Sequence, residues 1–343
     1  MKALLLSDVN RLEYVDVPTP EPGPDEVLVR VRACGICGSD VHGMGGGSGR
    51  RIPPLIMGHE VAGVIAQTGS AVTGWQPGDR VAIDSTISCG ACTYCTRGLI
   101  NLCDNRRVLG VSCADYRRDG ALAEYVVVPD RILYRLPNGI SFVEGAMVEP
   151  LSIAAHAVGR TPVDGETTAV VVGSGMIGLF VVQTLKAAGC GRIVAVDIDP
   201  NRLERAKAMG ADLALASDND NVVVKVRELT SGQGADVAYE VVGKNATVNL
   251  GIDTLRKGGT LVLVGNLDPC VELPLQTAVT RQLTLLGSAA SCGEYPWCLD
   301  MISGRRIDVG AIVSAVAPLN EGAAWFRRLR QGEEGLLKVV LEP

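Results

Sequence analysis

The amino-acid sequence predicts an α/β protein of two domains, one built on a doubly wound parallel sheet and the other largely β. The chain has 343 residues, too many for one ordinary core and suited to two domains of roughly 150 residues each. Its middle part alternates short β-branched runs with helix-like segments, whereas the parts before and after it do not. Such alternation is the pattern of a parallel sheet with helices on both faces.

The first part of the chain, residues 1–150, contains short β-rich pieces interrupted by Gly and Pro, such as EVLVRVRA at 26–33 and GDRVAI at 78–83. This pattern is typical of an irregular, largely β domain. Three consecutive glycines at 45–47 predict a loop. Asp8 and Arg11 fall where a signal-peptide core would have to form, so we expect no export signal.

The middle part, from about residue 165, predicts six strands and the helices between them. The strands are 168–173, 192–197, 212–216, 236–243, 260–265 and 282–287, and the helices are 174–188, 200–211, 221–232 and 245–259. Six strands are the number of a complete doubly wound dinucleotide-binding fold. The alternation ends near Gly287, and the remaining residues are too few to form a core of their own. We therefore expect one domain over 151–287 and another over 1–150 together with 288–343.

Residues 167–185 carry no charge, and a stretch of about 19 apolar residues raises the question of a membrane helix. Gly173, Gly175 and Gly178 interrupt it, however, and divide it into a buried strand and the start of a helix. Hydrophobic residues make up 47% of the chain and charged residues 20%, with a net charge of −6 and no run of Lys or Arg longer than two. We expect no membrane contact and no nucleic-acid partner.

A dinucleotide site is predicted where the strand at 168–173 meets the following helix. The sequence from Gly173 to Gly178 matches G-x-G-x-x-G, in which the glycines allow a tight turn, the approach of a pyrophosphate and close helix packing. Asp197 ends the next strand, where a carboxylate can bind both ribose hydroxyls and repel a 2′-phosphate, so NAD is favoured over NADP. Arg202 could weaken that preference. The predicted cofactor residues are Gly173, Gly175, Ile177, Gly178, Asp197 and Arg202, with Val264 and Gly265 beside the nicotinamide. The other interpretation is a helix-capping Asp197 beside packing glycines.

Eleven cysteines without an export signal indicate metal or thiol chemistry rather than disulfides. Cys89, Cys92, Cys95 and Cys103 follow C-x2-C-x2-C-x7-C, a spacing that can close a tetrahedron around structural Zn²⁺. A disulfide pair or coincidental thiols are the alternatives.

A second, open zinc site is predicted from dispersed residues, Cys37 in GICGSDVH and His59 with Glu60 in GHE. One thiolate, one imidazole and one carboxylate can hold a catalytic zinc and leave room for substrate. Asp40 could accept the second imidazole N–H of His59 and fix its tautomer, or could cap the following turn.

The order of the motifs GICGSDVH, GHE, the four-cysteine segment, GDRVA, VEPL and GSGMIG resembles the zinc-containing medium-chain dehydrogenase/reductase superfamily, in particular its polyol (sorbitol-type) branch. The likeness covers essentially the whole chain. It implies a largely β, GroES-like catalytic domain, a Rossmann domain, two zinc ions and NAD. It further implies hydride transfer between a secondary alcohol or polyol and NAD, in a cytoplasmic homodimer or homotetramer.

The resemblance also implies individual roles. Cys37, His59 and Glu60 would bind catalytic zinc, and Glu149 would either bind it or hold its water. In the simple alcohol dehydrogenase branch the position of Glu149 is a cysteine. Ser39 would hydrogen-bond the alcohol oxygen and His42 would pass its proton to solvent by way of the cofactor ribose. Alternatively, Ser39 would only cap a turn, and Glu149 would be a structural carboxylate. Lys338 would contact the pyrophosphate or be a solvated lysine at the end of a strand.

The chain departs from sorbitol-type enzymes before Tyr295, where Ala290 and Ser291 stand in place of their Arg-Tyr pair, so sorbitol itself is not implied. We expect Arg50 and Arg51 to be solvated loop residues, or else to reach an anionic group such as a substrate phosphate. Two other functions share these motifs. One is an amino-alcohol dehydrogenase resembling threonine 3-dehydrogenase, and the other is a non-catalytic NAD(P)H-binding protein of the same fold.

Overall fold

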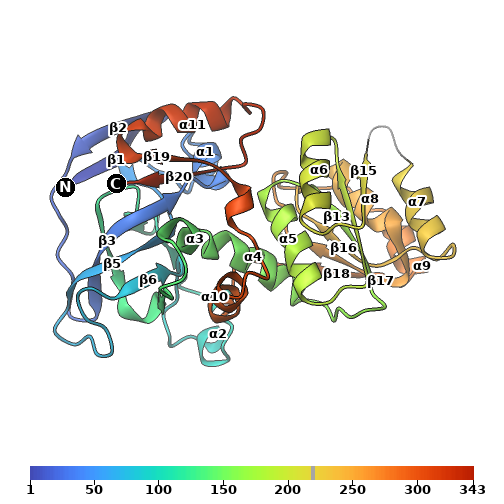
Figure 1. Cartoon of the computed structure of the whole chain (residues 1–343), viewed down its shortest axis with the longest axis horizontal. Helices are drawn as coiled ribbons and strands as arrows, with labels where there is room; N and C mark the ends of the chain where they lie inside the picture. The colour runs from blue at the N-terminus through green and yellow to red at the C-terminus, as the bar shows by residue number, and fades with distance from the viewer. Residues whose placement is uncertain (218–220) are drawn as a thin grey trace. The chain divides into compact units, whose positions relative to one another are not determined.

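The computed structural model describes residues 1–217 and 221–343. Their contacts divide the chain into two compact units, Met1–Pro150 with Cys292–Pro343, and Leu151–Ser291. The chain passes from the first unit to the second within helix α4 (Val148–Val158). Both chain ends belong to the first unit (Figure 1).

A seven-stranded sheet forms the centre of the first unit. Six strands lie in the order β12-β6-β5-β3-β20-β19, and β11 pairs with β3. Strand β20, at the end of the chain, pairs antiparallel with β3. The last residues of the chain therefore belong to the same sheet as the first part. The strand bounds are β3 (Glu26–Gly35), β5 (Glu60–Thr68), β6 (Arg80–Ile83), β11 (Tyr125–Pro129), β12 (Leu133–Arg135), β19 (Val313–Pro318) and β20 (Lys338–Glu342).

Smaller sheets and short helices complete the first unit. The small strands are β1 (Lys2–Asp8), β2 (Arg11–Asp16), β4 (Leu55–Ile56), β7 (Thr86–Ile87), β8 (Arg107–Val108), β9 (Val111–Ser112) and β10 (Arg117–Arg118). The α-helices are α1 (Gly38–Gly43), α2 (Thr93–Thr96), α3 (Phe142–Ala146), α10 (Tyr295–Ser303) and α11 (Gly322–Arg330). Short 3-10 turns cover Ile100–Leu102, Asp130–Ile132, Gly310–Ile312 and Leu319–Glu321.

The alternation in β3 explains why this segment forms a central strand. Val29 and Val31 are buried whereas Arg30 and Arg32 are exposed, as the period of two in an extended strand requires. Each buried valine contributes about 1.5–3 kcal/mol relative to an exposed one. The expectation of a largely β domain is confirmed.

A six-stranded parallel sheet forms the second unit, in the order β15-β14-β13-β16-β17-β18. Helices α5 and α6 contact each other and pack on β13 to β15, whereas α7 contacts α8, which packs on β13, β16 and β17 (Figure 1). The strands are β13 (Thr168–Val172), β14 (Arg192–Asp197), β15 (Leu213–Ala216), β16 (Ala235–Glu240), β17 (Leu255–Leu263) and β18 (Thr284–Gly287). The helices are α5 (Met176–Ala187), α6 (Pro200–Ala208), α7 (Val222–Leu229), α8 (Asn245–Thr254) and α9 (Leu275–Thr280). The predicted doubly wound sheet of six strands is confirmed.

One predicted helix is too long. The segment 245–259 was expected to be helical throughout, but α8 ends at Thr254 and β17 begins at Leu255. Leu255 has an extended backbone, with φ −70° and ψ 153°, and its side chain is buried. The burial of Leu255 therefore favours the strand, and Gly258, with φ +71°, lies in a conformation that a helix would not allow.

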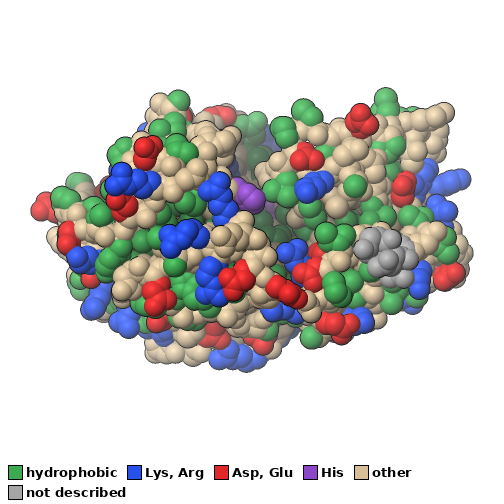
Figure 2. Space-filling model, turned by 90° about the horizontal axis from the view of Figure 1, so that it is seen from above, with side chains coloured by type: hydrophobic (Ala, Val, Ile, Leu, Met, Phe, Trp, Pro, Cys, Tyr) green, Lys and Arg blue, Asp and Glu red, His purple; other side chains and the backbone are tan. Residues whose placement is uncertain are grey.

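The uncharged stretch at 167–185 forms the buried strand β13 and most of α5. Among the described residues, no helix has both the length and the apolar character needed to cross a membrane. On the face seen in Figure 2, Lys and Arg side chains lie among Asp and Glu side chains rather than in one large basic patch.

Candidate active site and metal centres

Cys37 lies at the point where β3 has ended and α1 begins. It is the residue that caps the N-terminus of α1, and its sulfur accepts a hydrogen bond from the backbone N–H of Ser39 at 3.5 Å. The Ser39 hydroxyl lies 3.2 Å from the same sulfur. His42, in the last turn of α1, is exposed. The helix therefore carries the predicted thiolate ligand and both predicted relay residues.

Two glycines make room for His59 and Glu60, Gly58 just before them in the chain and Gly35 opposite Glu60 on the neighbouring strand β3. Gly58 has φ +96°, and a Cβ there would lie 2.7 Å from Leu122 Cγ, so only glycine fits this turn. A Cβ on Gly35 would lie 2.0 Å from the Glu60 carboxylate. The absence of a side chain at Gly35 thus leaves the space that the Glu60 carboxylate occupies.

Cys37, His59 and Glu60 can hold a metal ion. One ligand atom from each lies within 4.8 Å of the others, and His59 and Glu60 are buried. Burial, together with the nearby charge of Glu60, raises the pKa of Cys37 to about 11, although the Lys338 ammonium opposes this rise. A bound cation would reverse this by stabilising the thiolate. The donor set of one sulfur, one nitrogen and one carboxylate suits zinc.

Lys338 is the first residue of β20 and is 1% exposed. Its ammonium contacts both carboxylate oxygens of Glu60, at 2.7 and 2.6 Å, and donates to the Ile36 carbonyl at 2.9 Å. Burial opposes its charge, but the Glu60 carboxylate outweighs burial, so the pKa of Lys338 is raised. The expectation of a solvated lysine is wrong, because pairing with Glu60 makes the buried position favourable.

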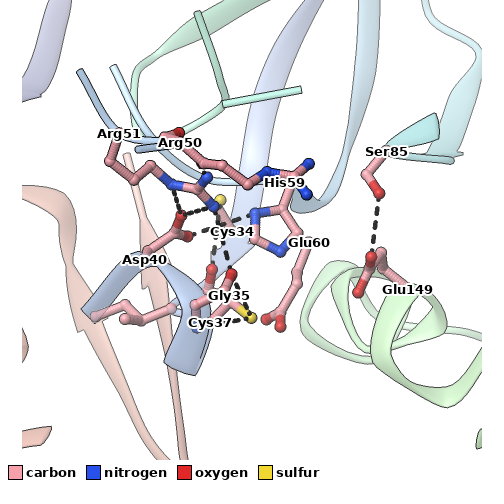
Figure 3. A network of polar contacts seen from close by, with 12 residues as sticks. Cys34, Gly35, Cys37, Asp40, Arg50, Arg51, His59, Glu60, Ser85 and Glu149 are labelled. Carbon is pink, nitrogen blue, oxygen red and sulfur yellow. Dashed lines mark hydrogen bonds and ion pairs between the residues drawn. The ribbon is translucent and has the colours of Figure 1, made fainter. Parts of the chain in front are cut away.

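Asp40 lies behind His59, as Figure 3 shows. Its Oδ2 is 3.5 Å from His59 Nδ1, which leaves Nε2 as the imidazole nitrogen available to a metal. Its Oδ1 contacts the guanidinium of Arg51 at 2.6 and 2.8 Å. Arg51 is 6% exposed, so the expectation that it is a solvated or substrate-reaching loop residue is wrong. Its neighbour Arg50 is exposed.

Glu149 lies in the first turn of α4 and is buried. Its Oε1 accepts a hydrogen bond from the Ser85 hydroxyl at 3.1 Å (Figure 3). Burial raises the pKa of Glu149 to about 8, with further contributions from His59, which lowers it, and from Glu60 and Cys37, which raise it. Glu149 is outside the group of three described side chains whose ligand atoms lie within 4.8 Å.

The four clustered cysteines come together in the segment that contains α2. The Cys92 and Cys95 sulfurs are 3.5 Å apart, and those of Cys89 and Cys95 are 3.9 Å apart. A tetrahedron with Zn–S bonds of about 2.3 Å requires sulfurs about 3.8 Å apart. Hydrogen bonds from the backbone N–H groups of Ala91 and Cys92 lower the pKa of Cys89 to about 6. All four sulfurs, including that of Cys103, lie within 4.8 Å of one another, which fits a closed zinc site.

The glycine-rich turn in the second unit joins β13 to α5. Gly173 has φ +101°, and a Cβ on Gly178 would lie 1.8 Å from the Gly173 carbonyl oxygen. Gly175 caps α5, and a Cβ there would meet no atom within 4 Å. Ile177 is half-buried in the first turn of α5. The turn thus leaves the helix N-terminus open to a pyrophosphate.

Asp197 ends β14 and faces this turn. Its Oδ2 accepts the Ser174 N–H at 2.6 Å, and its Oδ1 accepts the N–H groups of Ile198 and Asp199 at 2.8 and 3.0 Å. The guanidinium of Arg202 lies 3.9 Å from Oδ2. Oδ1 already accepts two hydrogen bonds, whereas Oδ2 accepts one, so Oδ2 keeps a lone pair for a ribose hydroxyl.

Val264 and Gly265 follow β17 directly. Their N–H groups both donate to the Glu240 carbonyl, at 2.9 and 3.0 Å. A Cβ on Gly265 would lie 2.2 Å from the Gly243 nitrogen, so the two turns after β16 and β17 touch through backbone atoms. Both residues lie at the carboxyl end of the parallel sheet, the edge at which such folds bind dinucleotides.

Comparison with known families supports both units. Residues 23–138 match the alcohol dehydrogenase GroES-like domain, and residues 177–304 match the zinc-binding dehydrogenase family. D-xylulose reductase A from Aspergillus niger is 36% identical over 96% of this chain and 94% of its own length. The chain belongs to the polyol branch of the zinc-containing medium-chain dehydrogenase/reductase superfamily.

Two further members of the superfamily have related names. L-idonate 5-dehydrogenase from Vitis vinifera is 38% identical over 92% of this chain and 86% of its own length. Sorbitol dehydrogenase from Bacillus subtilis is 32% identical over 100% of this chain and 97% of its own length. This polyol-branch chain is therefore an oxidoreductase that acts on CH–OH groups.

Solved medium-chain dehydrogenase structures show the same architecture. A zinc-binding dehydrogenase from Sinorhizobium meliloti with bound NADP has a TM-score of 0.92 and 32% identity, covering 100% of this chain and 99% of its own. An Escherichia coli alcohol dehydrogenase solved with NADH has a TM-score of 0.92 and 28% identity, with the same coverage. Galactitol-1-phosphate dehydrogenase from Escherichia coli has a TM-score of 0.92 and 26% identity, with both chains covered completely. The chain is a zinc enzyme that uses a nicotinamide dinucleotide.

Three contacts within the site were not predicted from the sequence. Arg51 contacts Asp40, Lys338 contacts Glu60, and Ser85 contacts Glu149. No local pattern in the sequence marks these contacts, since a lysine that opens a strand is ordinarily exposed and Arg51 and Ser85 lie in no motif.

Proposed function

We propose that this enzyme oxidises a secondary hydroxyl of a sugar alcohol or related polyol, with or without a phosphate or carboxylate, and transfers the hydride to NAD. The observation that carries this proposal is the convergence of Cys37, His59 and Glu60 within 4.8 Å, with the Ser39 hydroxyl 3.2 Å from the Cys37 sulfur. The names of the relatives, which include xylulose, sorbitol, idonate and galactitol 1-phosphate, support the substrate class.

Cys37, His59 and Glu60 would hold the catalytic zinc, and Cys89, Cys92, Cys95 and Cys103 the structural zinc. When bound at the first site, zinc polarises the substrate hydroxyl and lowers its pKa. Ser39 accepts the hydroxyl proton, and the exposed His42 passes it to solvent. As hydride leaves carbon, the alcohol becomes a ketone, and NAD⁺ becomes NADH with release of one proton.

The remaining site residues position these groups. Asp40 orients the imidazole of His59, and Lys338 balances the buried charge of Glu60. Glu149, held by Ser85, either joins the metal or holds a water beside it. Gly173, Gly175, Ile177 and Gly178 would bind the pyrophosphate, and Val264 and Gly265 would line the nicotinamide.

A substrate panel tests the activity. Purified zinc-loaded enzyme is assayed by NADH absorbance with sugar alcohols, aldonates, polyol phosphates, inositols, L-threonine and simple alcohols. We expect the highest kcat/KM for a polyol or one of its acidic derivatives. A preference for threonine would establish the amino-alcohol alternative. If the protein bound zinc and cofactor but turned over none of these compounds, it would be the non-catalytic NAD(P)H-binding protein.

We further propose that Asp197 makes the enzyme prefer NAD. Asp197→Ala removes an acceptor for the ribose hydroxyls and a charge that repels a 2′-phosphate, so the ratio of NAD to NADP kcat/KM should fall by about 10-fold or more. The guanidinium of Arg202 lies 3.9 Å from Asp197 and would attract a 2′-phosphate, so Arg202→Ala should raise the ratio. An unchanged ratio in Asp197→Ala would assign this residue to the turn alone.

We propose that two copies associate through the second unit. In the described part of this unit β18 pairs with one strand only, β17, so its outer edge offers backbone N–H and C=O groups. Leu275 and Val279 in the preceding α9 are 65% and 68% exposed. Edge-to-edge pairing of two copies would cover these groups, and pairs of dimers would form the tetramer. We place the enzyme in the cytoplasm, because its cysteines are free thiols.

A further inference from the structure

The catalytic unit contains a buried arginine whose contacts all lie beside the zinc ligands. Arg51 is 6% exposed, and its Nε donates to Asp40 Oδ1 at 2.8 Å. One terminal nitrogen, Nη2, contacts the same oxygen at 2.6 Å and also donates to the Ser39 hydroxyl at 3.3 Å. The other, Nη1, donates to the Arg50 carbonyl at 2.9 Å. A buried guanidinium is costly unless its donors are satisfied in this way.

The residues around Arg51 leave space for its side chain and hold its backbone in place. A Cβ on Gly43, the last residue of α1, would lie 2.5 Å from the Cγ of Arg51. The backbone on either side is held by Ser112, whose N–H donates to the Arg50 carbonyl and whose carbonyl accepts the Ile52 N–H. The position of the guanidinium is therefore constrained by the backbone bridge to Ser112 and by the space that Gly43 leaves at the end of α1.

Arg51 leaves the other oxygen of Asp40 facing the imidazole. Asp40 Oδ2 lies 3.5 Å from His59 Nδ1. Among the described residues, neither of these two buried atoms has a hydrogen-bond partner, so each faces the other across this 3.5 Å contact. Because the guanidinium occupies Oδ1, rotation of the carboxylate away from His59 would break the contacts at 2.6 and 2.8 Å.

Arg51 also constrains the hydroxyl of Ser39. That oxygen accepts a hydrogen bond from Nη2, so its own proton points elsewhere, and the Cys37 sulfur lies 3.2 Å away. A serine that passes on a substrate proton needs one lone pair directed at the substrate and a fixed direction for its own proton. The guanidinium supplies part of that constraint, because its hydrogen bond occupies one lone pair of the Ser39 oxygen.

We propose that Arg51 is a positioning residue that couples the metal site to the proton relay, because one guanidinium fixes both Asp40 behind His59 and the hydroxyl of Ser39. This inference rests on the proposed function of Ser39. It requires arginine, since a planar guanidinium can reach both partners in a fixed geometry whereas a lysine ammonium supplies a single point of charge.

The test separates the two contacts of Arg51. In Arg51→Met, Asp40 loses its partner, so zinc at the open site should be removed by a chelator at least about 10-fold faster than in wild type. The zinc at the four cysteines should remain. In Arg51→Lys, the charge beside Asp40 is kept, so zinc release should stay within a few-fold of wild type, while kcat falls about 10-fold or more with KM little changed.

A double-substitution cycle identifies the route of the kcat effect. If Arg51 acts through Ser39, Arg51→Lys should lower kcat in the wild-type chain but hardly at all in the Ser39→Ala chain. If Arg51→Lys lowered kcat by the same factor in the Ser39→Ala chain as in the wild-type chain, the coupling of Arg51 to Ser39 would be contradicted. Wild-type zinc release in Arg51→Met, or wild-type kcat in Arg51→Lys, would overturn the corresponding half of the proposal.

The matched control is Arg118→Lys. Arg118 pairs with Glu26 at 2.8 Å in the same unit, is partly buried, and contacts none of the zinc-site residues in the contacts described. It should retain wild-type zinc release and kcat. If Arg51→Met does not fold, Gly43→Ala displaces the same guanidinium without removing it and should show the same faster zinc release. Chelator release is measured with a metal-sensitive dye and needs no substrate, so it remains informative even if no polyol is turned over.

Discussion

At the scale of single residues, Glu149 is the predicted site residue whose role the family resemblance leaves open, either binding the metal or holding its water. It is buried, it is held by Ser85, and it lies outside the group formed by Cys37, His59 and Glu60. A carboxylate in that place can hold a polar ligand beside the metal without adding a permanent fourth bond. This arrangement suits polyols, which bring several hydroxyls to the site.

We predict that Glu149→Ala lowers kcat by about 10- to 100-fold while the Kd for NAD stays unchanged, since only the surroundings of the metal are altered. Glu149→Cys should bind the open-site zinc more tightly and shift the preference toward less polar alcohols. Steady-state kinetics and zinc content measured on the same preparations check both. Wild-type turnover with unaltered zinc in Glu149→Ala would leave Glu149 a structural role only.

A second residue-scale prediction concerns the stability of the fold. Asp84 is 2% exposed, and burial raises its pKa from 3.8 to about 6, although the Thr86 N–H bond opposes this. Between those two values the folded state binds more protons than the unfolded state, so stability falls as pH rises. The pKa of Asp84 differs by about two units between the folded and unfolded states, which lowers the free energy of unfolding above pH 6 by about 3 kcal/mol.

Asp84→Asn keeps an acceptor for Thr86 and removes the ionisation. The free energy of unfolding at pH 8 should therefore rise by about 1–3 kcal/mol, and its decline between pH 4 and 6 should be smaller. Urea unfolding at several pH values measures this, with the exposed Asp25→Asn as the control. A variant less stable than wild type at pH 8 would contradict the prediction.

At this scale, the sequence predicted which residues of one helix lie together, but not which distant residues pair with them. Cys37, Ser39 and Asp40 are neighbours in one helix, so their proximity follows from local spacing. Lys338 and Glu60 are 278 residues apart, and Ser85 and Glu149 are 64 apart. Their pairing depends on which strands of the first unit lie together, and no local pattern in the sequence contains that information.

At the scale of elements, the four-cysteine segment has little hydrophobic packing of its own. Its helix α2 has four residues and none of them is buried. Metal binding would therefore supply much of the free energy that orders this segment. The cysteine spacing alone predicted the cluster, because all its members lie within 15 residues and a short loop can close around one ion.

We predict that Cys103→Ser leaves one zinc per chain and lowers the unfolding temperature by several degrees, whereas activity at low temperature is largely retained. In wild type, a chelator should remove the open-site zinc first and abolish activity before stability changes. Elemental analysis and thermal unfolding check this, with Cys270→Ser, an exposed cysteine outside both clusters, as the control. Two zincs in Cys103→Ser would contradict the assignment.

The boundary between α8 and β17 shows where element prediction fails. The segment after Asn245 combines a helical pattern with an apolar run, and a sequence window cannot show where burial in the sheet overrides helix propensity. In the structure Leu255 is fully buried at the beginning of β17. The six strands themselves were predictable, because each is a short apolar run of strand length separated from the next by a helix or turn.

At the scale of the whole molecule, the sheet of the second unit ends in β18, whose outer edge has no strand partner among the described residues. Natural proteins seldom leave such an edge open beside exposed apolar side chains. Leu275 and Val279 lie just before this strand and are both more than half exposed. A second copy of the chain would satisfy the backbone groups and cover these side chains together.

We predict that the chain is a dimer, or a tetramer of two such dimers, with a mass of two or four times 36.0 kDa in solution. Leu275→Glu with Val279→Glu places two charges in the proposed interface, so the dimer should dissociate at least about 100-fold more readily. Light scattering coupled to size-exclusion chromatography measures the mass at several concentrations. Val224→Glu, on the exposed face of α7 in the same unit, is the control and should keep the wild-type mass. A monomeric wild type would refute the dimer, and a double variant with wild-type mass would move the interface away from β18.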